Sequence, residues 1–351
     1  MMKLVLIASI LFLTLNFNAG AGPLQGGSAP LTRQEIISML RQAELRQVPQ
    51  GDIATEIERR GIAFAVDEKA LAEFKQAGAR SFLLDSIRRA SQHAGKPPPA
   101  APEASAVDAD QPVSAEDLAR MPLLEQARRH ALEYSRELPN FIVTQAVTRY
   151  AQTPGDKDWQ VQDRLDLELT YEAAKGERFK LLRVDGAPAR QAYEELGGST
   201  STGEFASILR ALFVPESKTV FKEVKREEFR GRETVVYDYS VQRANSKSVI
   251  VDKSSGQQVV AGYRGSIWVD AESGRVLRIE ESNEGMPPGF PVTLSENAVE
   301  YDWVTIGEER YMLPVRAEVL MGWDRLKTYS RNVIEFKGYK KFETKIRLDP
   351  N

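Results

Sequence analysis

Apolar and polar residues alternate over most of the second half of the chain. The alternation is regular in residues 165–171 and 235–241, where every second side chain is apolar. Successive side chains of a strand point to opposite faces, so this period gives one buried face and one solvated face. About ten such segments lie between Phe141 and Leu348, joined by short turns. The pattern predicts one large, curved antiparallel sheet.

Residues 31–94 follow a helical period instead. Residues 32–35, Thr-Arg-Gln-Glu, have the form of a capping box, in which the first and last side chains satisfy free amides at a helix start. Apolar residues then recur every three or four positions, and Gly61 and Gly78 stand where glycine commonly ends a helix. We expect a small all-α bundle of four short helices. The predicted fold class is therefore α+β, a curved antiparallel sheet preceded by this bundle.

Two helical segments lie within the predicted β domain, residues 114–351. The first begins at Ser114 and is divided at Pro122, because proline favours a helix start over a helix interior. The second, residues 202–213, follows another capping box and ends before Pro215. Its apolar stripe should cover the apolar face of the sheet, either as a lid on a ligand or as ordinary core packing. The stripe consists of Phe205, Ile208, Leu209 and Leu212.

The first 21 residues, 1–21, have the composition of a secretory signal peptide. Lys3 precedes an apolar run from Leu4 to Phe17, and the residues up to Ala21 have the small-x-small form of a cleavage site. The run is shorter than the ~20 apolar residues of a membrane-spanning helix. We therefore expect cleavage near Ala21, a periplasmic location, and no integral membrane span after cleavage.

Composition narrows the classes of partner. The chain has no cysteine, so it forms no disulfide bond and lacks the residue that bacterial lipoproteins modify. Lys and Arg total 47 against 50 Asp and Glu, which leaves no basic excess for nucleic acid. Residues 22–30 are a leader rich in Gly, Pro and Ser. Residues 95–113 are rich in Pro and Ala, which predicts a disordered linker.

One segment, residues 263–280, gathers residue types that catalysis uses. It contains Trp268 and Asp270, a glutamate two residues further on, and three arginines. The alternation of a strand nevertheless continues through it, and Gly274 supplies the positive φ that a hairpin turn requires. We interpret the segment as a β-hairpin whose Asp270 bonds the amides of its own turn.

No other group of residues predicts catalysis, a metal site or a cofactor. The two histidines, His93 and His130, lack metal-ligand spacing, and no G-x-S-x-G elbow accompanies them. The loop Gly197–Gly203, GGSTSTG, lacks the G-K-[ST] ending of a phosphate-binding loop.

A Pro/Gly loop, residues 284–291, carries two apolar side chains without strand neighbours, Met286 and Phe290. They either pack on the rim of the sheet or form an exposed tip that contacts a membrane or a partner.

Three segments together resemble the outer-membrane lipoprotein carrier (LolA/LolB-like) superfamily, over about residues 120–345. They are LPNFIVTQAVTRY (138–150), with Phe141 and Gln145 at the F-x-x-x-Q positions, the hairpin with Gly265–Asp270 at G-x-(I/L)-W-(I/V)-D, and SRNVIEFKGYKKF (330–342). The resemblance implies an unclosed half-barrel whose apolar inner face is covered by helices and takes an acyl chain or other hydrophobic molecule. Residues 31–94 resemble a helical module of other secreted bacterial proteins.

Three functions follow from these observations. The first is a non-catalytic periplasmic carrier or binding protein for lipid, acyl or other hydrophobic ligands. The second is an interaction or sensor module of the cell envelope, which would hold an envelope protein through residues 31–94. The third is a carboxylate-based hydrolase, although no pair of acidic residues stands out among the many.

Overall fold

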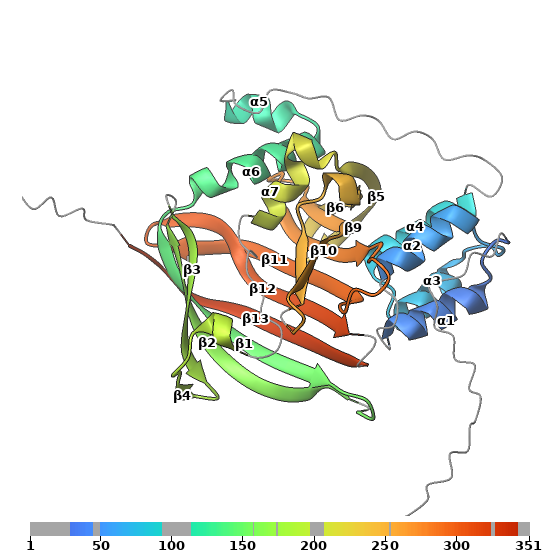
Figure 1. Cartoon of the computed structure of the whole chain (residues 1–351). Helices are drawn as coiled ribbons and strands as arrows, with labels where there is room; N and C mark the ends of the chain where they lie inside the picture. Colours follow the sequence, from blue (N-terminus) through green and yellow to red (C-terminus); the bar gives the residue numbers. More distant parts are fainter. Residues whose placement is uncertain are drawn as a thin grey trace, which may run out of the picture.

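The computed structural model describes residues 29–44, 50–92, 114–156, 158–172, 175–196, 207–252, 254–323 and 327–342. The predicted signal peptide, most of the leader and the linker 95–113 lie outside these residues. Within them the chain forms a helical bundle, one large sheet with covering helices, and a small hairpin (Figure 1). The predicted fold class, α+β with an unclosed antiparallel sheet, is confirmed.

The N-terminal helices are α1 (Arg33–Glu44), α2 (Gln50–Arg60), α3 (Glu68–Gln76) and α4 (Ser81–Gln92). The predicted capping box is formed at the start of α1: Thr32 N donates to Glu35 Oε2 at 2.7 Å, and Glu35 N donates to Thr32 Oγ1 at 3.2 Å. Gly61 and Gly78 follow α2 and α3 with φ of +71° and +87°, so glycine ends both helices as expected. Apolar side chains of all four helices meet in one buried cluster.

The large sheet contains 11 strands among the described residues, in the order β4-β3-β2-β1-β13-β12-β11-β10-β9-β6-β5, and each neighbouring pair is antiparallel. The strands are β1 (Phe141–Gln152), β2 (Gln160–Glu172), β3 (Gly176–Val184), β4 (Ala187–Pro188), β5 (Val220–Phe229), β6 (Arg232–Val241), β9 (Gly262–Asp270), β10 (Val276–Glu284), β11 (Leu294–Ile306), β12 (Glu309–Trp323) and β13 (Thr328–Lys341). Strands β4 and β5 form the two edges, so the sheet is not closed into a barrel. A separate hairpin joins β7 (Val249–Asp252) and β8 (Gln257–Val260).

Helices cover one face of this curved sheet, which we call the inner face (Figure 1). They are α6 (Leu123–Glu137) and α7 (Ser207–Phe213), while α5 (Ala115–Arg120) lies beyond α6, away from the sheet. 3-10 turns lie at Tyr193–Glu195, Pro215–Ser217 and Arg243–Asn245. Pro122 separates α5 from α6, as the sequence predicts. Tyr134 of α6 donates from its hydroxyl to the carbonyl oxygen of Met312 at 2.7 Å, which ties the helix to the sheet. The main core lies between α6, α7 and the inner face.

The bundle packs on the opposite, outer face, where α2 contacts β9 and β10 and α4 contacts β9. Polar contacts hold it there. Gly51 N of α2 donates to Ser282 Oγ at 3.2 Å, and Arg89 Nη1 of α4 lies 2.6 Å from Asp238 Oδ2. A Cβ on Gly51 would lie 2.8 Å from the carbonyl oxygen of Asn283, so glycine permits this close approach of helix and strand. In the part of the chain that the structure describes, no helix is both long and apolar enough to cross a membrane.

Candidate functional site

The hairpin 263–280 is formed as predicted, by β9 and β10, with Gly274 at φ +65° in the turn. Asp270 is 2% exposed and accepts hydrogen bonds from Ser273 Oγ at 2.6 Å and from Glu272 N at 3.4 Å. It also forms an ion pair with Arg232 of the neighbouring strand β6. Because its oxygens bond the turn and this arginine, Asp270 stabilises the hairpin, and the interpretation of this segment as structural is supported.

The strand register places seven apolar side chains and the ring of one tyrosine side by side across the inner face. This apolar row contains no residue more than 6% exposed. Its members, in order across the sheet, are Leu165, Val147, Ile334, Ala317, Val299, Ile279, Ile267 and Tyr237. It is the floor of the main core beneath α6 and α7.

One step further along every strand, the next inner-face row has a different character. Its members are Asp163, Arg149, Asn332, Val319, Asn297, Glu281, Gly265 and Tyr239, again paired strand to strand in that order. We call it the polar row, since six of the eight side chains carry polar groups. At its centre Val319, Asn297 and Glu281 remain partly exposed, in contrast to the apolar row beside them.

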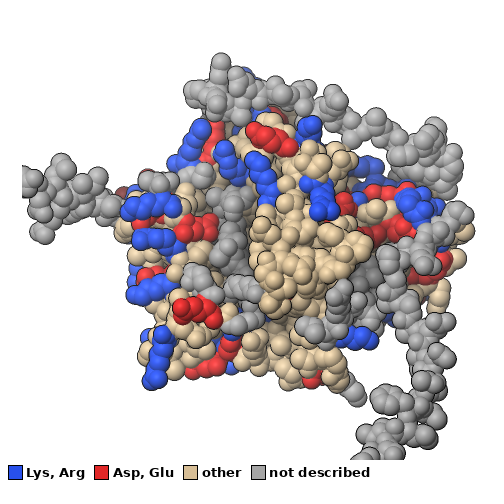
Figure 2. All heavy atoms as spheres, viewed as in Figure 1, with Lys and Arg blue, Asp and Glu red and all other residues tan. Residues whose placement is uncertain are grey.

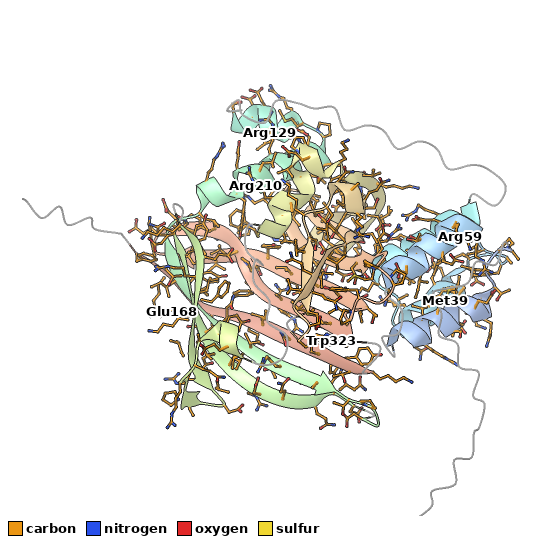
Figure 3. All side chains as sticks on the ribbon, in the orientation of Figure 1. Met39, Arg59, Arg129, Glu168, Arg210 and Trp323 are labelled. Carbon is orange, nitrogen blue, oxygen red and sulfur yellow. The ribbon has the colours of Figure 1, made fainter. Side chains whose placement is uncertain are left out.

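Two separate coverings flank the polar row. On one side α7 contributes Leu209 and Leu212, 4% and 1% exposed, to the main core, and Phe213 stacks on Phe221 with ring centroids 5.0 Å apart. On the other side, the β7–β8 hairpin packs on the far end of β12. There a small cluster gathers Ile250, Val259, Ala261, Phe290, Val292, Met286, Met321 and Trp323. Figure 3 labels Arg210 on α7 and Trp323 at the end of β12, which mark these two ends.

The predicted lid residues are only partly described. Phe205 lies outside the described residues, as does the predicted capping box at 201–204, and the helix is described from Ser207 onward. Leu209 and Leu212 point into the main core, and Ile208 is partly buried against it. Arg210 Nη1 donates to the carbonyl oxygen of Leu132 on α6 at 3.3 Å, which links the two covering helices. The ligand-facing role of these four residues stays a prediction.

The loop 284–291 lies against the β7–β8 hairpin. Phe290 is 8% exposed and belongs to the small cluster, and Met286 is partly buried against it. Of the two alternatives that the sequence left open, this placement corresponds to packing on the rim of the sheet. Contact of the loop with a membrane or a partner stays a prediction. The exposed large apolar side chains nearby are Val249 and Val251, at 52% and 47%, on the outer side of β7.

Glu281 is the electrostatically unusual group of the polar row. Burial raises the pKa of its carboxyl to about 7, and the hydrogen bond that Asn297 Nδ2 donates to Glu281 Oε1 at 3.4 Å only partly offsets this. Tyr239 and Tyr263 stand beside it with the pKa of each hydroxyl raised by burial. The sequence contained a signal for this unusual carboxyl. The inward-facing residues of β10 are Leu277, Ile279 and Glu281, so a glutamate occupies a position where the alternation predicts an apolar residue.

Charged residues gather elsewhere. Figure 2 shows charged side chains on the flanks of the molecule in this view, with an uncharged area between them. On the outer face an open cleft of about 310 Å³ is lined by Arg230, Arg278, Ala298, Glu300, Arg316, Ala317 and Glu318. Its arginines are paired with its own carboxylates.

Among the described residues no group of three or more His, Asp or Glu side chains could hold a metal ion.

Neither a protein-family model nor a curated protein matches the chain. Among solved structures, a LolA superfamily protein of Nitrosomonas europaea is similar at 16% identity and a TM-score of 0.27, covering 67% of this chain and 96% of that one. A DUF1329 family protein of Desulfovibrio piger is 9% identical with a TM-score of 0.32, over 63% of this chain and 94% of the other. The lipoprotein LppX of Mycobacterium tuberculosis is 8% identical with a TM-score of 0.23, over 64% and 96%.

A member of the superfamily that the sequence resembles is thus among the solved structures similar to this chain.

Proposed function

We propose that this protein is a non-catalytic carrier or binding protein for a lipid, an acyl chain or another hydrophobic ligand, and that it works in the periplasm. The ligand lies on the inner face of the sheet, along the polar row and between α7 and the β7–β8 hairpin. The observation that carries this proposal is the break in burial between adjacent rows. The apolar row is fully covered, whereas Val319, Asn297 and Glu281 keep accessible surface between two separate coverings.

The physical chemistry of the site suits a hydrophobic ligand. Each methylene group that leaves water contributes about 0.8 kcal/mol, and this gain needs no specific polar partner. The site is flanked by Met321 and Trp323 on one side and by the apolar stripe of α7 on the other. Methionine adapts to ligands of different shape because its side chain is unbranched and polarizable.

The predicted lid fits this site. The helix predicted at 202–213 carries Phe205, Ile208, Leu209 and Leu212, and a ligand would replace contacts that Leu209 and Leu212 now make with the main core. We infer that α7 moves when ligand enters, while α6 stays anchored through the bond from Tyr134 to Met312.

Native mass spectrometry of the protein purified gently from the periplasm tests the proposal. We expect a population whose mass exceeds that of the chain by one lipid-sized molecule, which is released by organic solvent. The same measurement gives the mass of the mature chain, and a start near residue 22 would support the predicted signal peptide. A mass equal to the chain alone, together with no binding of a fluorescent fatty acid, would contradict the proposed function.

The alternative, an envelope interaction module acting through residues 31–94, has one relevant observation. Helices α2 and α4 already contact the sheet of the same chain, so those faces of the bundle have a partner within the molecule. Affinity capture with α1 and α3 surface variants separates this alternative from the carrier, because the carrier should keep its ligand. No observation favours the carboxylate hydrolase.

A further inference from the structure

The centre of the polar row contains hydrogen-bond acceptors with few donors opposite them. Asn297 Oδ1 is buried and has no hydrogen-bond partner. For Glu281, the donor that the described residues place opposite is Asn297 Nδ2, at 3.4 Å. A buried acceptor without a donor is costly, and a bound molecule that donates hydrogen bonds removes that cost.

No cation among the described residues faces Glu281. The titratable groups that interact electrostatically with Glu281 are Tyr239 of β6 and Tyr263 of β9, the strand next to β10. The arginine of the polar row, Arg149, stands four strands away, about 19 Å at the usual strand spacing. It is bound to Asp163 through Nε–Oδ1 at 2.7 Å.

We propose that Glu281 and Asn297 form the subsite for the polar head of the ligand, and that this head donates hydrogen bonds. The ligand class is then an amphiphile with an ammonium, hydroxyl or amide head, in preference to one with a carboxylate or phosphate head. This inference rests on the proposed function and narrows its ligand class.

The charge of Glu281 sets the selectivity. Burial raises the pKa of its carboxyl to about 7, so at pH 8 it is mostly a carboxylate and repels an anionic head. At pH 6 it is mostly protonated and can itself donate to an anionic head. A head that donates is accepted at both pH values. Selectivity against anionic heads should therefore weaken as the pH falls through 7.

Three ligands with the same twelve-carbon chain test this: dodecylamine, 1-monolauroylglycerol and laurate. Each competes with the neutral fluorescent probe N-phenyl-1-naphthylamine for the whole chain, at pH 6 and pH 8. We expect the amine and the monoglyceride to bind at least tenfold more tightly than laurate at pH 8, about 1.4 kcal/mol, with the difference from laurate reduced at pH 6.

Two variants give the control. Glu281→Gln removes the charge and should bring laurate within threefold of the monoglyceride at both pH values. Glu168→Gln makes the same chemical change on the outer face of β2, labelled in Figure 3, and should retain the wild-type selectivity.

The outcomes separate the two proposals. If all three ligands displace the probe with equal affinity, or if laurate binds most tightly at pH 8, the head-group subsite is wrong and the proposed function stands. If none of the three displaces the probe and no lipid is found by mass spectrometry, both proposals are overturned.

Discussion

Tyr239 reaches across Gly265 and donates from its hydroxyl to the carbonyl oxygen of Glu280 at 2.8 Å. The three residues lie on adjacent strands β6, β9 and β10, and the tyrosine hydroxyl lies beside the space that a side chain at position 265 would need. A Cβ on Gly265 would lie 1.7 Å from the Glu280 oxygen and 2.8 Å from the tyrosine hydroxyl oxygen. Glycine in this position of the polar row is therefore a packing requirement.

Gly265→Ala should destabilise the protein by about 3 kcal/mol, because the added carbon forces the strands or the tyrosine to shift. Tyr239→Phe keeps the ring and loses one hydrogen bond, so we expect a loss of about 1 kcal/mol. Urea unfolding followed by far-UV circular dichroism measures both. Equal, small losses for the two variants would show that the strands accommodate the methyl group and that the close approach is unimportant.

The helical bundle is attached to the sheet by a buried ion pair. Arg80 Nη2, just before α4, lies 2.8 Å from Glu296 Oε2 on β11, and Glu296 is 5% exposed. Removing one partner leaves the other charge without compensation in a poorly solvated site. We expect Arg80→Met to reduce the free energy of unfolding by about 3 kcal/mol.

The double variant Arg80→Met with Glu296→Met removes both charges and should recover much of that loss. Arg120→Met is the control, because the pair that Arg120 forms with Glu116 is 71% and 76% exposed. A surface pair of this kind contributes about 0.5 kcal/mol at most. If the double variant is as unstable as Arg80→Met, shape rather than charge holds the bundle on the sheet.

Local sequence patterns predicted the helices, strands and turns well, because these elements depend on interactions between residues close in the sequence. The capping box at Thr32 and Glu35, the turn at Gly274 and the alternation in residues 165–171 all depend on neighbours a few positions away. The inner and outer faces of the strands followed directly from the period of two.

The polar row could not be predicted from the sequence because it depends on the register between neighbouring strands. Its residues come from eight strands between positions 149 and 332, and irregularities such as the shift after Arg149 in the β1–β2 pairing break simple phase counting. In the sequence, each of these polar residues is a single exception among the apolar residues that alternate along its strand. The packing of the bundle on the sheet could not be predicted for a related reason. Arg80 and Arg89 have the sequence context of solvated surface charges, and only the folded structure shows that they pair with Glu296 and Asp238.

The loop that carries Phe290 gives a test of whether its apolar side chains serve packing or contact. Phe290 is 8% exposed within the small cluster around the β7–β8 hairpin. We expect Phe290→Ala to reduce stability by about 3 kcal/mol, because it leaves a cavity among Val292, Ile250 and Val259.

Val251→Ala, at a side chain that is 47% exposed, should change stability by less than about 0.5 kcal/mol. Cosedimentation with phosphatidylglycerol vesicles supplies the second measurement. If Phe290→Ala leaves stability intact and abolishes vesicle binding, the loop is a membrane contact rather than part of the cluster.

The ionisation of Glu281 should appear in the pH dependence of stability. The pKa of this carboxyl rises from 4.5 to about 7 on folding, so between these values the folded state holds a proton that the unfolded state has released. The contribution of this carboxyl to the free energy of unfolding is fully present below pH 4.5. It is lost as the pH rises to 7, because the folded state binds more protons than the unfolded state in that interval. Glu281→Gln cannot ionise and escapes this loss.

The variant should therefore gain stability relative to the wild type between pH 5 and pH 8, by about 2 kcal/mol after allowance for the partial exposure of the side chain. Guanidinium unfolding at pH 5, 6.5 and 8 measures the difference. Glu168→Gln, on the outer face, controls for the exchange of a carboxyl for an amide. A constant difference between Glu281→Gln and the wild type over this range would mean that Glu281 is as well solvated in the folded chain as in the unfolded one, and that the centre of the polar row is open to water.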